Sequence, residues 1–378
     1  MSEGRGKKVV LAMSGGVDSS VAAVLLQEAG YEVVGCFMRL GSDRDNEIEY
    51  DNLSEEGCEP SKVRIGKQGC CSVNDASDAR LVAAMLGIPF YVLNFKADFG
   101  RIIDYFVDAY HAGRTPNPCV RCNDWLKFGK LHDYARSIDA DFVASGHYAR
   151  IERREGEPRL MRGVDDHKDQ SYVLFGASAE RRAQMLLPVG GLTKDETRAV
   201  AERHRLPVFN KPDSQEICFV PDNDYARLVK KRSEPGRVRP GPIVDSRGKQ
   251  LGEHPGQQHF TIGQRRGVNL ALGYPIYVVD KDPVTNTVTV GTQDELLAEG
   301  ATANQVTWHE PVLPEDWVGC EVKVRYNSRP VPGRVRGAEG GFEVRFDEPV
   351  SAVTPGQAVV CYREDVVMGG GWIERAIR

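Results

Sequence analysis

The amino-acid sequence predicts an α/β fold: a doubly wound parallel sheet, then a small middle domain and an all-β, barrel-like C-terminal domain. In the first half, apolar runs typical of strands alternate with segments of helical periodicity, a pattern that forms parallel sheets. After about residue 210, Gly, Pro and short strand-like runs dominate, which is typical of a small barrel or sandwich. The predicted domains are 1–210, 211–284 and 285–378.

Local patterns place each element of the first domain. Lys8–Met13 is expected to be a buried strand, and a Gly-rich turn joins it to a helix that Gly30 ends. In chain order, the elements expected after this strand are a helix over 18–29, a strand over 31–38, a helix over 74–86, a strand over 90–95, a helix over 97–111 and a strand over 141–145. The later strand-like runs are 259–264, 275–280, 287–291, 321–326, 341–346 and 357–362.

Charge is distributed unevenly along the chain. The 378 residues include 49 Lys and Arg and 54 Asp and Glu, and the net charge of −5 taken alone argues against a nucleic-acid binder. However, residues 40–68, where we expect a long loop, contain eight acids and four bases. Residues 225–249 contain eight bases and two acids. This local excess is the pattern expected for binding an RNA backbone.

The sequence predicts a cytosolic protein with reduced cysteines. It contains no apolar run of about 18 residues that would span a membrane, and its start, MSEGRGKKVV, lacks the features of a signal peptide. In a reducing compartment, the nine cysteines are candidates for catalysis, metal binding or the core rather than for a disulfide framework.

The first candidate site is the turn SGGVDSS (14–20) between the first strand and the first helix. Its two glycines allow positive φ and a close approach of phosphates, and the helix N-terminus presents free N–H groups to an anion. Asp18 is a candidate for holding Mg²⁺ or for orienting the loop. The loop lacks Gly-Lys-Ser/Thr, so it is not a Walker A loop. The alternative, a turn that only caps a helix, leaves the serines and Asp18 unexplained.

The second candidate site is the segment GRTPNPCVRCN (113–123). Asn117 is expected to cap a helix that has Pro118 at its first position. Cys119 and Cys122 then lie on one face of the first turn, where the helix N-terminus stabilises a thiolate. A structural zinc site is the alternative for this pair, but it would require a second C-x-x-C. Cys218, in DSQEICF (213–219), is a third candidate thiol, with a core residue as its alternative.

The SGGVDSS loop resembles the PP-loop of ATP pyrophosphatases, in which an acceptor oxygen attacks the α-phosphate of ATP and pyrophosphate leaves. That group contains amide-forming ligases and tRNA-sulfurating enzymes. The remaining motifs, in their order along nearly the whole chain, resemble those of the tRNA-specific 2-thiouridylase family. They are GRTPNPCVRCN, SGHYAR (145–150), KDQSY (168–172), DSQEICF, FTIGQRRG (260–267) and TPGQAVVCY (354–362).

The resemblance implies roles for specific residues. The residues implied to bind ATP are Ala12, Met13, Ser14, Gly15, Gly16, Val17, Asp18, Ser19, Met38 and Gly146. The residues implied to contact the target base, once it is flipped out of the stack, are Asn117, Pro118 and Cys119. The residues implied to contact tRNA are His147, Lys168, Asp169, Gln170, Arg325, Tyr326 and Gln357. A hydrogen-bonded structural histidine is the alternative for His147, and a solvated charge is the alternative for Arg325.

The resemblance also implies a mechanism. ATP adenylates O2 of uridine 34, a persulfide on Cys218 delivers sulfur to C2, and Cys122 releases it by closing a disulfide that must be reduced. The family commonly has Asp where this chain has Cys119. As an alternative route, Cys119, Cys122 and Cys218 bind a [4Fe–4S] cluster. The implied cofactors are ATP and Mg²⁺, with the cluster in the alternative route.

The implied partners are tRNAs with U34, namely the Lys, Glu and Gln acceptors, and a persulfide donor such as a cysteine desulfurase or a sulfur-relay protein. We expect a monomer and no membrane partner. Two rival functions explain less of the sequence. A PP-loop amide-forming ligase needs an ammonia source and leaves the three cysteines without a role. A non-enzymatic nucleotide-sensing or RNA-binding module explains the loop and the basic segment but not the cysteines.

Overall fold

The computed structural model describes residues 4–41, 73–154, 156–212, 217–220 and 224–378. Most of the predicted acidic loop and the Asp-Ser-Gln-Glu stretch before Cys218 lie outside the described residues. Cys58, Cys70 and Cys71, for which the sequence predicts no role, also lie outside them.

A five-stranded parallel sheet forms the first part of the chain, in the order β3-β2-β1-β4-β7. Its strands are β1 (Lys8–Ala12), β2 (Glu32–Arg39), β3 (Phe90–Asn94), β4 (Phe142–Ser145) and β7 (Met185–Leu186). The helices around it are α1 (Val17–Glu28), α2 (Val73–Leu86), α3 (Lys96–His111), α5 (Leu131–Ser137), α6 (Ala179–Ala183) and α7 (Lys194–Arg203). The predicted doubly wound sheet is confirmed, and its predicted strands and helices are correct to within one residue at each end.

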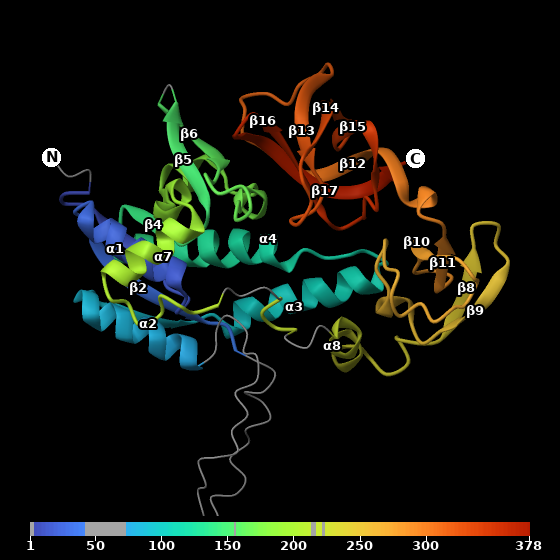
Figure 1. The fold of residues 1–378 in the computed structure, drawn as a ribbon, viewed down its shortest axis with the longest axis horizontal. Coiled ribbons are helices and arrows are strands. Elements are labelled where there is room, and N and C mark those ends of the chain that lie inside the picture. Colours follow the sequence, from blue (N-terminus) through green and yellow to red (C-terminus); the bar gives the residue numbers. More distant parts are fainter. Residues whose placement is uncertain (1–3, 42–72, 155, 213–216, 221–223) are drawn as a thin grey trace, which may run out of the picture.

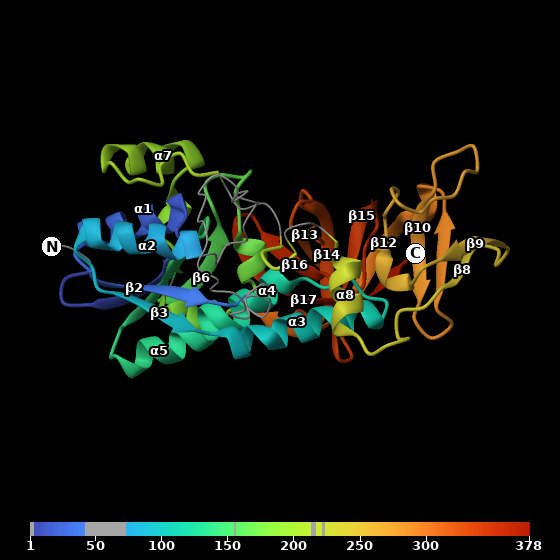
Figure 2. The same cartoon turned by 90° about the horizontal axis from the view of Figure 1, so that it is seen from below.

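Both faces of this sheet are covered by helices. Because successive side chains of a strand point to opposite faces, neighbouring residues of one strand enter different cores. Val9 and Leu11 of β1 pack in one core with α1, α2 and α7, whereas Val10 and Ala12 pack in another core with α3 and α5. Figure 2 shows the sheet between these two groups of helices. The continuous apolar run of β1 is therefore explained by burial on both sides.

The middle part of the chain contains a helix and a four-stranded sheet in the order β10-β11-β8-β9. The elements are α8 (Tyr225–Arg232), β8 (Gly241–Asp245), β9 (Gln250–His254), β10 (Tyr277–Asp282) and β11 (Thr287–Gly291). The expectation of a strand over 259–264 is wrong. Gly263 has a φ of +88°, and Gln264 N–H donates to Thr261 O at 3.0 Å, so this run turns, although Phe260 and Ile262 remain buried.

The C-terminal part is a six-stranded barrel in the order β12-β15-β14-β13-β16-β17, which β12 and β17 close. Its strands are β12 (Leu297–Trp308), β13 (Val318–Lys323), β14 (Val331–Ala338), β15 (Gly341–Ser351), β16 (Ala358–Arg363) and β17 (Val366–Ile377). A hairpin of the first half, β5 (Ala149–Arg154) and β6 (Glu157–Arg162), joins β17 where Val366 pairs with Met161. Figure 1 shows this hairpin beside the barrel.

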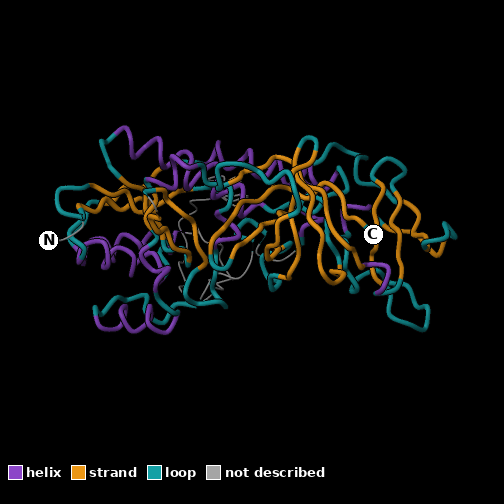
Figure 3. The backbone as a smooth tube through the Cα atoms, turned by 90° about the horizontal axis from the view of Figure 1, so that it is seen from above, coloured by secondary structure: helices purple, strands orange, loops and turns teal. Residues whose placement is uncertain are grey.

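The arrangement is elongated, with helices gathered around the first sheet and strands dominating the other end (Figure 3). Helix α3 runs from the first sheet toward the middle part of the chain (Figures 1 and 2). No helix in the described ranges is long and apolar enough to cross a membrane.

Candidate active site

The predicted nucleotide loop lies between the carboxyl end of β1 and the start of α1. Gly15 has a φ of +75°, and a Cβ there would lie 2.2 Å from Asp75 O, so the backbone and the space both require glycine. Ser14 N–H donates to Ser19 Oγ at 3.2 Å, and Ser19 Oγ donates to Gly16 O at 3.2 Å. Among the described residues, no side-chain hydrogen bond caps α1 at its N-cap residue, Gly16. Its N–H groups therefore suit an anion such as a nucleotide phosphate.

Two more predicted ATP residues lie at the same edge of the sheet. Met38 is near the carboxyl end of β2, and Gly146 follows β4 directly. A Cβ at Gly146 would lie 2.6 Å from both Asp18 C and Ser19 N, so the two segments touch backbone to backbone. The carboxyl edge of an open parallel sheet is where such folds bind ligands.

Asp18 is held by residues that sequence reasoning missed. Its carboxylate accepts a hydrogen bond from Tyr148 OH at 2.8 Å and contacts Lys194 Nζ at 2.7 and 3.0 Å. Lys211 Nζ donates to Gly15 O at 2.9 Å and pairs with carboxylates at the start of α2. These contacts orient the loop, because Lys194 and Lys211 fix it from segments far along the chain.

The predicted cysteine helix is present as α4 (Pro118–Cys122). Asn117 caps it, since Val120 N–H donates to Asn117 Oδ1 at 3.3 Å, and Pro118 occupies its first turn as predicted. A π-helical turn (Asn123–Lys130) and α5 continue the same helical run. Cys119 is exposed and Cys122 is half-buried, so both thiols lie at or near the surface of this first turn.

Arg121 lies between the two cysteines in an aromatic cage. Its guanidinium is 3.9 Å from the ring centroid of Trp372 and 5.2 Å from those of Tyr105 and Trp125. Its Nη2 donates to Gln305 Oε1 at 2.6 Å. Trp372 and Gln305 belong to the barrel, so stacking of a cation on aromatic faces joins the cysteine helix to the C-terminal part.

Cys218 approaches the same region through its neighbours. Phe219 makes edge-to-face contacts with Phe99 and Phe106 of α3, at centroid distances of 5.5 and 5.2 Å. Cys122 and Cys218, which are both half-buried, pack against the same hydrophobic core. The fold therefore brings two cysteines that are distant in the sequence to one core beside α3.

Two tyrosines interact with residues of the cysteine segment, and one of them, Tyr326, is a predicted RNA contact. Burial raises the pKa of Tyr326, the hydrogen bond of its hydroxyl with Gln170 opposes this rise, and Asp169 and Cys119 reinforce it electrostatically. Tyr172 OH contacts the Asn117 side chain and donates to Ala358 O at 2.9 Å. Tyr326 is 38% exposed, which leaves its ring accessible for stacking on a base.

Comparison with known proteins gives consistent matches along the chain. Family models match residues 7–222 (tRNA methyl transferase HUP domain), 233–292 (tRNA methyl transferase PRC-barrel domain) and 298–373 (aminomethyltransferase beta-barrel domain). The tRNA-specific 2-thiouridylase MnmA of Rhodopirellula baltica is 47% identical over 388 residues, covering 98% of this chain and 97% of that protein. The chain belongs to the tRNA-specific 2-thiouridylase family.

A second 2-thiouridylase, MnmA of Geotalea uraniireducens, is 48% identical over 375 residues, covering 98% of this chain and 96% of that protein. A solved structure of the U34-tRNA thiolase NcsA from Methanococcus maripaludis, with its [4Fe–4S] cluster, is 20% identical. It covers 62% of this chain and 69% of that chain, with a TM-score of 0.34. That likeness is too weak to support an argument, so the full-length 2-thiouridylases define the family.

In this chain, four of the residues implied to contact tRNA have side chains that bind within the protein. Asp169 is buried and accepts from Gly163 N and from both donors of Ser171. The other three side chains bind backbone atoms. Gln170 accepts a hydrogen bond from Tyr148 N, and Arg325 donates to Ser351 O and Ala352 O. Gln357 donates to Thr115 O and Pro116 O. Their role as direct tRNA contacts stays a prediction, as does that of Lys168, which is half-buried.

His147 is 6% exposed, and both of its ring nitrogens have partners. Its Nδ1 is 2.6 Å from Ser145 Oγ and its Nε2 is 3.4 Å from Lys127 Nζ. Burial, reinforced by Lys127, lowers the pKa of His147 well below its usual value, so the ring is neutral at pH 7. This placement favours the alternative of a structural histidine.

The described residues contain no group of three His, Cys, Asp or Glu side chains that could hold a metal ion. The cluster route stays an alternative prediction, and the persulfide route needs only Cys122 and Cys218.

Proposed function

We propose that this protein catalyses the ATP-dependent 2-thiolation of uridine at position 34 of tRNA. The observation that supports it most directly is spatial. A PP-loop at the edge of a parallel sheet occurs in one fold with two half-buried cysteines that pack on the same core. The near-full-length identity to 2-thiouridylases supports the same reaction.

The first step activates a poor leaving group. Uridine O2 attacks the α-phosphate of ATP, the bond to the β-phosphate oxygen breaks, and pyrophosphate leaves. The N–H groups at the start of α1 and the hydroxyls of Ser14 and Ser19 stabilise the phosphate charge as it develops. We expect Mg²⁺ to accompany ATP. Asp18 orients the loop through its contacts with Tyr148 and Lys194.

The second step transfers sulfur. The terminal sulfur of a Cys218 persulfide attacks C2, and the Cys122 thiolate then attacks Sγ of Cys218. The S–S bond of the persulfide breaks, and its electron pair stays on the sulfur bound to C2. The C2–O2 bond also breaks, and O2 leaves as part of AMP together with the electron pair of that bond. The products are 2-thiouridine, AMP and a Cys122–Cys218 disulfide. A dithiol reductant restores the two thiols, and a persulfide donor recharges Cys218.

Two of the matching family models are described as tRNA methyl transferase domains. Methyl transfer, however, gives no role to the nucleotide loop or to the two cysteines. A methyl transfer does not require an α-phosphate site beside a pair of cysteines. We therefore assign the activity from the full-length relatives rather than from the domain description.

The test measures pyrophosphate release and thiolated uridine for the wild type, Cys122→Ser and Cys218→Ser. Each variant is expected to lose thiolation while ATP binding and tRNA-dependent pyrophosphate release persist. Cys361→Ser is the matched control, because Cys361 lies in the barrel core. Retained thiolation in either variant, or pyrophosphate release driven by a small metabolite without tRNA, would contradict the proposal. Full activity of an iron-free preparation would exclude the cluster route.

A further inference from the structure

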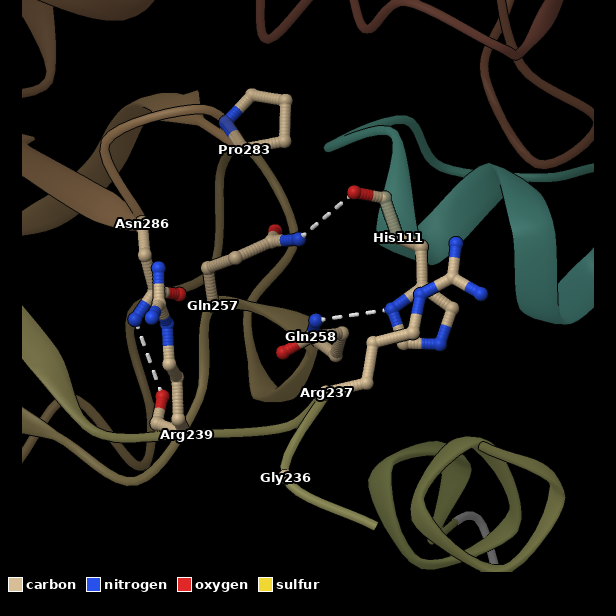
Figure 4. A pocket seen from close by; sticks show the side chains of 8 residues that line it. All are labelled: His111, Gly236, Arg237, Arg239, Gln257, Gln258, Pro283 and Asn286. Carbon is tan, nitrogen blue, oxygen red and sulfur yellow. Dashed lines mark hydrogen bonds between the residues drawn. The ribbon is translucent and has the colours of Figure 1, made fainter. Parts of the chain in front are cut away.

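A polar cavity of about 350 Å³ lies between the end of α3 and the middle part of the chain. The residues that line it include His111, Arg237, Arg239, Gln257, Gln258 and Asn286. Figure 4 shows the guanidinium of Arg237 beside the ring of His111, and the side chain of Arg239 beside Asn286. No Asp or Glu is among the described residues that line it. Two guanidinium groups therefore line one cavity whose described lining contains no carboxylate, although Asp108 of α3 acts electrostatically on His111.

The wall of this cavity is firmly built. Gln257 and Gln258 are 1% and 5% exposed, and their Nε2 atoms donate to Tyr110 O at 2.9 Å and contact His111 Nδ1 at 3.1 Å. His111 Nε2 is 2.7 Å from Ser233 Oγ, which joins α3 to the end of α8. Asn286 Nδ2 donates to the carbonyl oxygens of Arg239 and Pro240. The arginines project from a fixed frame, so the frame does not have to form when a ligand arrives.

A neighbouring cavity provides the contrast. It is about 670 Å³, and its lining pairs Arg101 and Arg114 with Asp104 and Asp108. Acids and bases balance there, so it offers an anion no net attraction. The first cavity differs from this neighbour because its charged side chains are all basic. It also differs from most small-molecule pockets, which are lined mainly by apolar side chains. The paired N–H donors of a guanidinium group match the oxygens of a phosphate group, and no carboxylate in the described lining competes for them.

The position of the cavity favours a phosphate from RNA over a free anion. Pro283, which lines it, lies against Gly113, where a Cβ would be 3.1 Å from Pro283 Cδ. Gly113 starts the loop that reaches Asn117, and four residues of chain span at most roughly 14 Å. The last turn of α8 contains three further basic residues, and the helix ends at Ser233, which contacts His111. The cavity therefore lies within reach of an RNA strand that is bound at the cysteine helix.

We propose that this cavity is a binding site for a backbone phosphate of the tRNA, held by Arg237 and Arg239. The site anchors a nucleotide near the target uridine and reads charge rather than sequence. It rests on the proposed function, because that function makes tRNA the substrate.

The test measures tRNA binding without ATP by fluorescence anisotropy from 50 to 300 mM salt, so it does not depend on whether the protein thiolates uridine. We expect Arg237→Ala/Arg239→Ala to weaken binding roughly tenfold and to reduce the slope of log Kd against log salt by about 1, the loss of one phosphate contact. The kcat at saturating tRNA should not change. Arg247→Ala, on the exposed β8–β9 turn, removes a charge from the same basic segment and should change Kd less than threefold.

An unchanged salt slope in the double variant would overturn the proposal, as would an equal loss of affinity in Arg247→Ala. A second measurement separates the two sources of phosphate. Inorganic phosphate is titrated against the thermal stability of the full chain. Stabilisation that the double variant loses, with unchanged tRNA affinity, would assign the cavity to a free anion and would also overturn the proposal. Circular dichroism of the variants checks that they remain folded.

Discussion

Gly146 offers a direct test of the contact between β4 and the nucleotide loop. In Gly146→Ala, the new Cβ would lie 2.6 Å from Asp18 C and Ser19 N, whereas ordinary contact begins at 3.4 Å. The loop must therefore shift by roughly 0.8 Å, because both atoms belong to the backbone and cannot rotate away. A misplacement of about 1 Å at a reacting centre costs on the order of 10²-fold in rate. Overpacking of this kind costs about 1–3 kcal/mol in stability.

The assay is tRNA-dependent release of pyrophosphate, with ATP affinity measured by calorimetry. We expect kcat/KM for ATP to fall about 30- to 100-fold, from the same geometric penalty. Gly191→Ala is the matched control, since a Cβ at Gly191 meets no heavy atom within 4 Å. If Gly146→Ala kept its ATP affinity and kcat/KM within about threefold of the wild type, the loop would not require this contact, and the reasoning would be refuted.

Two further predictions concern stacking and a buried charge. Tyr326→Ala should weaken tRNA binding by about 1–3 kcal/mol if the exposed ring stacks on a base, whereas Tyr326→Phe should bind normally; equal losses in both variants would point to the hydroxyl instead. Lys281 is 7% exposed, and burial lowers its pKa to about 7 from the usual value near 10.4. Between these pH values only the unfolded chain keeps the proton, so Lys281 makes stability rise with pH by up to about 1.4 kcal/mol per unit. Lys281→Met removes this contribution, so the free energy of unfolding of the variant relative to the wild type should fall steadily as pH rises. Denaturant unfolding at pH 7, 8.5 and 10 measures this difference, and a constant difference would contradict the assignment.

The parts of the site that depend only on residues close together in the sequence were predictable. Asn117 and Pro118 predict a capped helix, and the structure contains it, with Cys119 in its first turn and Cys122 as its last residue. The strand–loop–helix around SGGVDSS was predictable for the same reason. These features depend on backbone geometry over a few residues, which the order of residues specifies directly.

Short strand-like runs were less reliable. Residues 259–264 have the apolar alternation of a strand, but Gly263 and the hydrogen bond from Gln264 to Thr261 turn the chain there. Burial of Phe260 and Ile262 satisfies the apolar pattern without a strand. Hydrophobic alternation reports which side chains are buried, and it does not by itself report how the backbone is paired.

The sequence by itself determined the parallel α/β sheet and the nucleotide loop, because periodicity, caps and motif spacing are local. Cys119 and Cys122 were candidates from their spacing at a predicted helix start, whereas the role expected for Cys218 came from the family resemblance. Only the tertiary structure decided what holds them in place. Lys194 contacts Asp18 from 176 residues away, and Gln357 donates to Thr115 O from 242 residues away. The barrel closes through β12 and β17, and its Trp372 stacks on Arg121 between the two cysteines of α4. Such contacts follow from how whole layers pack, so no local pattern along the chain records them.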